Sequence, residues 1–110
     1  MPLVPVSHHS VTIANGAQLS GAVNLRGQAV HGLYTPAAFT GTALTFEACD
    51  TEGGTYVPVH TAAGAAYSVT VAAGRFTVVD PAVIRGLQFL KVKSGSAEGA
   101  ARVLKLAARF

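Results

Sequence analysis

The sequence lacks several residue types on which common protein functions depend. It contains no tryptophan, one cysteine and five carboxylate side chains among its 110 residues. The single cysteine, Cys49, cannot form a disulfide within the chain, so we expect stability to come from packing or from partner chains. Aromatic residues make up 7% of the chain, which leaves few platforms for stacking sugars or nucleic-acid bases. Since no run of about 18 consecutive apolar residues is present, we expect no membrane-spanning helix and no membrane partner.

Charge is scarce, whereas apolar residues are abundant. Charged residues account for 12% of the chain and hydrophobic residues for 50%, a ratio that excludes an intrinsically disordered chain. The net charge of +3 is not gathered into a basic stripe, so no nucleic-acid partner is expected. The length suits one domain, because most domains have about 100–150 residues. A small fold with so few charges leaves apolar surface exposed, which is typical of an interaction site.

Short alternating runs of apolar and polar residues, separated by Gly, Pro and Asn, predict β-strands. The Asn15-Gly16 dipeptide predicts a tight turn that joins residues 10–14 and 18–26 as a hairpin. Pro58 lacks an N–H, which predicts an edge strand or a bulge. Residues 102–110 are rich in alanine and could form a helix, but their period of two favours a strand. The remaining runs cover residues 29–34, 42–49, 55–60, 67–71, 75–79 and 87–93.

We therefore expect an all-β protein, an antiparallel β-sandwich of jelly-roll type with about eight short strands. Asp80, Pro81 and Gly86 predict one short helical turn near residues 81–85, because they are typical of a helix cap, a first turn and a helix end. Residues 1–9 are expected to form an extended N-terminal arm, and residues 10–110 a single β-sandwich domain.

The sequence offers few groups for chemistry. Asp50 and Glu52 occupy one predicted hairpin tip, which is typical of a solvated turn. The four histidines and Cys49 lack the spacing of a structural zinc site, and adjacent His8 and His9 point to opposite sides of a strand. We accordingly expect no catalytic residue, no metal and no cofactor, and the chain is not expected to be an enzyme.

Two groups of residues are candidates for binding a partner. Pro2, Leu3, Val4, Pro5 and Val6 cannot form a helix and could lie over a neighbouring subunit as a clamp. Lys91, Lys93, Lys105 and Arg109 would share one cationic outward face if the last two strands pair. Lysine on a strand also guards against edge-to-edge aggregation, which is the alternative for the second group.

Several segments resemble one type of small virion protein in tailed bacteriophages, the β-sandwich head decoration or cement proteins. The segments are Ser10 to Leu25, Leu44 to Ala48, Glu52 to Val59, Asp80-Pro81 and Leu87 to Gly95. The resemblance implies a structural protein of the phage particle that binds the outer capsid surface and stabilises the head. It implies the major capsid protein or other virion proteins as partners, a homo-oligomer with a trimer favoured, and location in the virion after assembly in the host cytoplasm.

A glycan- or receptor-binding β-sandwich module of a phage tail or fibre is the alternative, because jelly rolls often bind sugars through their loops. Tyr34, Phe39 and Tyr56 are its candidate stacking residues.

Overall fold

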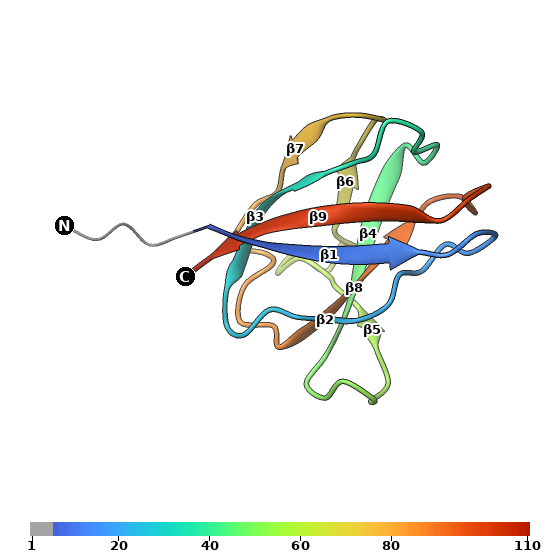
Figure 1. Ribbon diagram of the computed structural model, residues 1–110. Helices are drawn as coiled ribbons and strands as arrows, with labels where there is room; N and C mark the ends of the chain where they lie inside the picture. The colour runs from blue at the N-terminus through green and yellow to red at the C-terminus, as the bar shows by residue number, and fades with distance from the viewer. Residues whose placement is uncertain (1–5) are drawn as a thin grey trace.

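Two antiparallel β-sheets pack face to face in the computed structural model, which describes residues 6–110 (Figure 1). Sheet A has the order β1-β9-β3-β7, and sheet B has the order β2-β8-β4-β5, with β6 also pairing with β4. The strands are β1 (Ser7–Ile13), β2 (Val23–Asn24), β3 (Ala29–Tyr34), β4 (Ala43–Cys49), β5 (Val57–Pro58), β6 (Ser68–Thr70), β7 (Phe76–Val78), β8 (Phe89–Ser94) and β9 (Arg102–Arg109). The predicted all-β sandwich is therefore confirmed, with nine strands.

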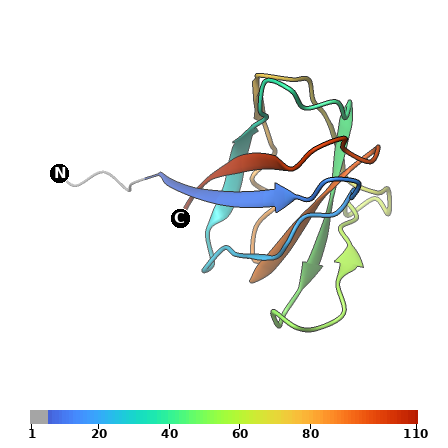
Figure 2. The same ribbon diagram turned by 45° about the vertical axis from the view of Figure 1, so that its right-hand side comes forward.

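The strands pair in a nested order. β1 pairs with β9, β2 with β8, β3 with β7, and β4 with both β6 and β5, all antiparallel. Further pairing of β3 with β9 and of β4 with β8 joins these nested pairs into the two layers of the sandwich. Figure 2 shows blue β1 and red β9 side by side, with green β4 of the other sheet running at a steep angle to them.

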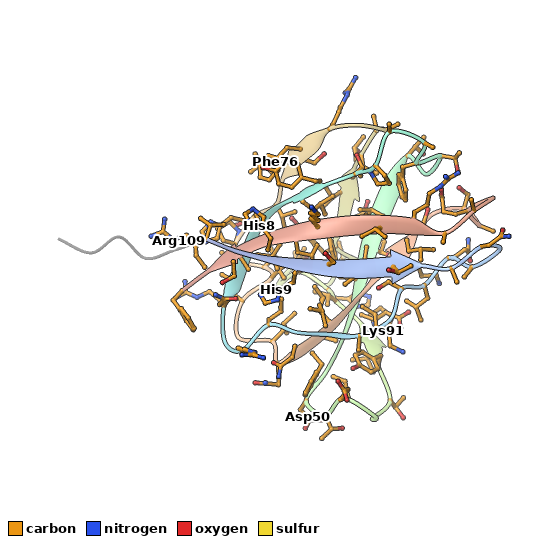
Figure 3. The ribbon with its side chains drawn as sticks, viewed as in Figure 1. His8, His9, Asp50, Phe76, Lys91 and Arg109 are labelled. Carbon is orange, nitrogen blue, oxygen red and sulfur yellow. The ribbon has the colours of Figure 1, made fainter. Side chains whose placement is uncertain are left out.

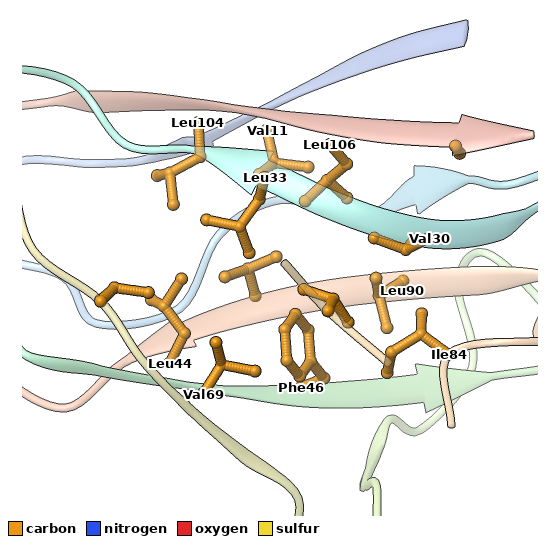
Figure 4. Close-up of a cluster of buried hydrophobic side chains, with 14 of the residues drawn as sticks. Val11, Val30, Leu33, Leu44, Phe46, Val69, Ile84, Leu90, Leu104 and Leu106 are labelled. Carbon is orange, nitrogen blue, oxygen red and sulfur yellow. The ribbon is translucent and has the colours of Figure 1, made fainter. Parts of the chain in front are cut away.

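Alternation along the strands builds the core between the sheets. Leu104 and Leu106 point inward from β9, and they face Leu44 and Phe46 of β4 (Figure 4). Phe46 is fully buried, and burial of such a side chain contributes about 1.5–3 kcal/mol to folding. The alternation of apolar and polar residues along β4, β6, β8 and β9 thus matches the alternation of buried and less buried positions.

The predicted hairpin across Asn15-Gly16 forms only beside the turn and does not extend along the two runs. Gly16 does turn the chain, with φ of 78°, but the turn carries it from sheet A into sheet B, where Val23 pairs with Leu90. The two runs share an isolated bridge between Ile13 and Ser20 and a hydrogen bond from the Gly21 N–H to Thr12 O at 3.3 Å. The main partner of β1 is instead β9, which pairs with all seven residues of β1 along its other edge.

The predicted boundary between the arm and the sandwich also changes. The sandwich begins at Ser7 rather than at residue 10, because β9 is long enough to pair Ser7 with Ala108. Residues 7–9 thus belong to sheet A and not to the arm.

At the predicted helical turn, the Asp80 carboxylate accepts a hydrogen bond from the Ala82 N–H at 3.0 Å, as a cap does. The chain makes a single hydrogen-bonded turn there, and no helix is assigned within residues 6–110.

Pro58 lies where its missing N–H predicts. β5 is an edge of sheet B and is only two residues long. Among the residues that the structure describes, no helix is long and apolar enough to cross a membrane.

Candidate interaction surface

The solvent-facing side of sheet A carries most of the exposed large hydrophobic side chains. We call this side the outer face of sheet A and define it by His8, Tyr34, Phe76, Val78 and Val103, with Val6 just before β1. Tyr34 and Phe76 are each 46% exposed, Val103 is 48% exposed and Val78 is 74% exposed. Contiguous apolar surface of this kind is typical of a binding site.

An aromatic cluster forms the centre of this face. The Tyr34 and Phe76 rings lie 4.7 Å apart between centroids, and the His8 and Tyr34 rings lie 6.2 Å apart. The Phe76 ring lies against Gly32 of β3, where a Cβ atom would collide with it. Glycine at residue 32 therefore lets an aromatic ring lie directly on the backbone of the sheet.

Two shallow grooves flank the aromatic cluster. The larger has a volume of about 640 Å³ and is lined by His8, Ser10, Tyr34, Thr35, Pro36, Val103 and Lys105. The second is lined by Val6, His8, His31, Tyr34, Phe76, Ala107, Ala108 and Arg109. Because both are open to solvent along the sheet, they suit an extended partner surface better than an enclosed small molecule.

Cations, and no carboxylates, line these grooves. Lys105 and Arg109 each reach one of them. The chain's carboxylates are elsewhere: Glu47 is on β4, Asp50 and Glu52 follow β4, Asp80 follows β7, and Glu98 is buried. The face therefore combines apolar side chains with positive charge, which complements a partner that is apolar with an acidic border.

The predicted single cationic face is wrong. β8 and β9 lie in different sheets, so Lys91 and Lys93 project from sheet B while Lys105 and Arg109 project from sheet A. Figure 3 shows Lys91 on the side of Asp50, away from His8 and Arg109. β8 pairs with β2 and β4, whereas β9 pairs with β1 and β3, so these lysines lie in different layers even though β8 and β9 are adjacent in sequence.

The structure does bring together residues from both predicted groups. Val6, at the end of the predicted arm, lines the same groove as Arg109. Pro2, Leu3, Val4 and Pro5 lie outside the described residues. The prediction that His8 and His9 point to opposite sides is confirmed, since His8 is exposed and His9 turns inward to hydrogen-bond Gln28 at 2.7 Å.

The residues proposed to stack on sugars do not form one site. Tyr34 is exposed, but Phe39 is buried in the core and is wrong as a surface residue. Tyr56 lies beside sheet B, where the Lys91 ammonium sits 4.4 Å from its ring centroid. Of these three aromatic residues, only Tyr34 is exposed on the outer face of sheet A.

Sequence reasoning missed Phe76, Val78 and Val103. The signal was available in β7, where Phe76 and Val78 alternate with Thr77 and the buried Val79, so both sides of the strand contain apolar residues. Such a strand is either buried on both sides or exposes an apolar face, and only the sheet order shows that β7 is at an edge.

Glu98 was also missed as a structural residue. Its buried carboxylate accepts hydrogen bonds from the Thr40 N–H at 3.1 Å, the Thr40 hydroxyl at 3.0 Å, the Ser94 hydroxyl at 3.3 Å and Arg102 Nε at 3.1 Å. Burial by itself raises the pKa of this carboxyl, but these hydrogen bonds outweigh it and hold the pKa below its ordinary value. The ionised group therefore joins the β8–β9 loop to the loop that precedes β4.

Metal ligands are not gathered anywhere in residues 6–110, where no group of three or more His, Cys, Asp or Glu side chains could hold an ion. Cys49 is half-buried, with its Sγ 3.7 Å from an Asp50 carboxylate oxygen.

Comparison with known proteins identifies the fold alone. No protein-family model and no curated protein matches the chain. Among solved structures, the SPBc2 prophage-derived protein YomS superposes with a TM-score of 0.57 at 16% identity, over 98% of each chain. The Drosophila NLP core matches with a TM-score of 0.44 at 11% identity, over 96% of this chain and 97% of that one. The Yersinia pseudotuberculosis-derived mitogen matches with a TM-score of 0.37 at 13% identity, over 97% of this chain and 86% of that one.

Proposed function

We propose that this chain is a structural protein of a bacteriophage particle, a capsid decoration or cement protein that binds the outer capsid surface through the outer face of sheet A. The observation that carries the proposal is the exposed cluster of Tyr34, Phe76 and Val103 with Lys105 and Arg109 beside it. The full-length likeness in fold to a prophage-derived protein supports the phage context. Binding, rather than chemistry, is the role that such a surface supports.

The partner that fits is the major capsid protein or another virion protein with an apolar patch bordered by carboxylates. Docking would cover the aromatic cluster and place the partner's acids near Lys105 and Arg109. Stabilisation of the head follows because a protein bound across neighbouring capsid subunits favours the assembled state by mass action. The chain would then be found in the virion, after assembly in the host cytoplasm.

Purified particles test this proposal directly. Phage particles produced with and without the gene for this chain are purified on density gradients, analysed by mass spectrometry and heated while DNA release is followed. We expect the chain in stoichiometric amounts and DNA release at a lower temperature from particles that lack it. A chain absent from purified particles, or equal heat stability of the two preparations, would overturn the proposal.

A glycan-binding role is a second candidate because the larger groove places the exposed Tyr34 ring beside His8, Ser10 and Lys105. An aromatic platform with hydroxyl and cationic neighbours suits an acidic sugar. A glycan array with the purified chain separates the two roles, since binding that Tyr34→Ala abolishes would favour the sugar.

A further inference from the structure

One edge of sheet A is a long strand whose outer side has few backbone hydrogen-bond partners. β1 is the terminal strand of the sheet and pairs with β9 over seven residues without a register shift. On its other side, Thr12 O accepts a hydrogen bond from Gly21 N at 3.3 Å, and Ile13 bridges Ser20. Backbone groups alternate in direction along an antiparallel strand, so His8 and Ser10 point to the same side as Thr12. Nothing within residues 6–110 pairs with the backbone N–H and C=O groups of His8 and Ser10 on that side.

The other sheet edges are protected and this one is not. β6 and β7 have three residues each, β2 has two, and β5 has two including Pro58. Short strands and proline are the usual means by which proteins prevent edge-to-edge pairing. β1 contains no proline and no lysine, and its register with β9 is free of bulges. It therefore has the properties of a strand that pairs with another chain.

Open space borders the free edge. A groove of about 570 Å³ lies between β1 and the segment around β2, lined in part by His9, Val23, Asn24 and Gln28. The Gln28 side chain donates a hydrogen bond from Nε2 to the Ser7 hydroxyl at 2.9 Å, and its Oε1 accepts one from His9 Nε2 at 2.7 Å. These bonds hold the three side chains against the core. An added strand would have room for its inward side chains in this groove.

We propose that β1 pairs antiparallel with β1 of a second copy of this chain, which joins the two A sheets into one continuous eight-stranded sheet across a twofold axis. This pairing would satisfy the free backbone groups of His8 and Ser10 in both copies. It leaves the outer face of sheet A open, so it does not depend on the proposed particle role.

Charge favours a second copy as the partner at this edge. β1 has no formal charge at pH 7, with histidine neutral. On sheet A, Lys105 lies directly opposite Ser10 on β9, and Arg102, which forms an ion pair with Glu98, lies opposite Ile13. Arg26 lines the groove beside the free edge. In the paired sheet, the two β9 strands would be about 14 Å apart, three strand spacings, and beyond the Debye length of about 8 Å at physiological salt. Two outer faces packed against each other would instead bring Lys105 and Arg109 of both copies together.

Sedimentation equilibrium of the purified full chain tests the pairing. We expect the mass to rise with concentration from 11.2 kDa toward twice that value. Ser10→Pro removes the N–H on the free side but leaves the ladder with β9 intact, and we expect it to weaken association at least tenfold. The matched control Ser10→Val keeps the N–H and should associate as the unmodified chain does. Val78→Lys, at the opposite edge of the sheet, should also leave association unchanged.

A second variant covers the case in which Ser10→Pro fails to fold, which circular dichroism would reveal. His8→Lys combined with Ser10→Lys preserves the backbone and places like charges opposite each other across the new strand pair. We expect this variant to be a folded monomer. A wild-type monomer at all concentrations, a trimer, or an assembly that persists in the double variant would overturn the proposal. Because the measurement uses isolated protein, that result would leave the particle role untouched.

Discussion

The outer faces of the two sheets differ in the side chains that they expose to solvent. On sheet B, Lys91 lies over the Tyr56 ring and directly opposite Glu47 in the strand register, so its charge has neighbours that favour it. On sheet A, Lys105 and Arg109 border grooves lined by apolar and aromatic side chains. One face therefore suits water and the other suits a partner, although both belong to the same small sandwich.

The difference arises at the outward positions of the strands. Those of β4 and β8 hold Thr45, Glu47, Lys91 and Lys93, whereas those of β3 and β7 include Tyr34, Phe76 and Val78. The inward positions are alike in both sheets and build one core. Substitutions at outward strand positions are therefore enough to make one face suitable for a partner, and they leave the core unchanged.

The largest expected effect comes from the buried group that joins the two sheets. Glu98 lies in the loop between β8 of sheet B and β9 of sheet A, with its side chain fully buried against Arg102. Glu98→Ala should lower the free energy of unfolding by about 3 kcal/mol, because it leaves the Arg102 charge and the Thr40 donors without their acceptor. Urea denaturation measures this loss. A loss close to zero would show that the sheets are held together by the apolar core alone.

We also expect the Glu98 carboxylate to make the stability of the fold sensitive to acid. Since the hydrogen bonds to Glu98 lower its pKa in the folded chain, the stability that it contributes is present above the pKa of the unfolded chain. That stability is lost as pH falls below the ordinary glutamate pKa of about 4.3 and through the lowered folded value. Thermal unfolding followed by circular dichroism from neutral to acidic pH measures it. Glu98→Gln should flatten this acid dependence, and an unchanged profile would assign it to other carboxyls.

Charge at the centre of the outer face of sheet A should separate binding from stability. Phe76→Glu removes the ring pair with Tyr34, which is worth about 1 kcal/mol, so the fold should remain intact. Particle affinity should fall by about 2 kcal/mol, or about thirtyfold, if Phe76 is a central contact. Co-sedimentation with purified particles measures the affinity. The control Thr70→Glu, exposed on sheet B, should bind normally, and equal losses for both variants would remove the distinction between the faces.

Charge reversal compares the cations of the two sheets. Lys105→Glu with Arg109→Glu should weaken particle binding by about 1 kcal/mol at low salt, and less as salt screens the interaction. The matched pair Lys91→Glu with Lys93→Glu should have no effect, since these residues lie on sheet B. Binding measured over a range of salt concentrations tests this. A salt-dependent loss in the sheet B pair would move the docking surface to that side.

The smallest expected effect on the fold comes from deletion of residues 1–6. β1 begins at Ser7, so the thermal midpoint should be unchanged, whereas particle binding should weaken because Val6 lines a groove on the outer face of sheet A. Melting curves and co-sedimentation measure the two effects. A truncated chain that binds particles normally would refute the predicted clamp.

Much of the fold could be predicted because alternation records which side of each strand is buried. Leu44 and Phe46, and Leu104 and Leu106, face the core as their spacing predicts. The pairing of strands could not be read in the same way, since β1 finds β9 some ninety residues along the chain rather than its neighbour in sequence. Local turn chemistry at Asn15-Gly16 predicted the turn correctly, but the pairing beside it is limited to Thr12, Ile13, Ser20 and Gly21.

The candidate surface was predicted only in part. Val6, Lys105 and Arg109 were recognised by composition and charge, but Lys91 and Lys93 were grouped with them because sequence proximity suggested that β8 and β9 pair. Phe76 became a candidate only when β7 was placed beside β3 at the edge of sheet A.

By itself, the sequence determined that the chain forms a β-sandwich with surplus apolar surface, because period two and the scarcity of charge are local and compositional properties. The tertiary structure decided where that surplus lies and which strand edge is free. Both depend on which distant strands become neighbours, and that choice is made by the packing of the whole core.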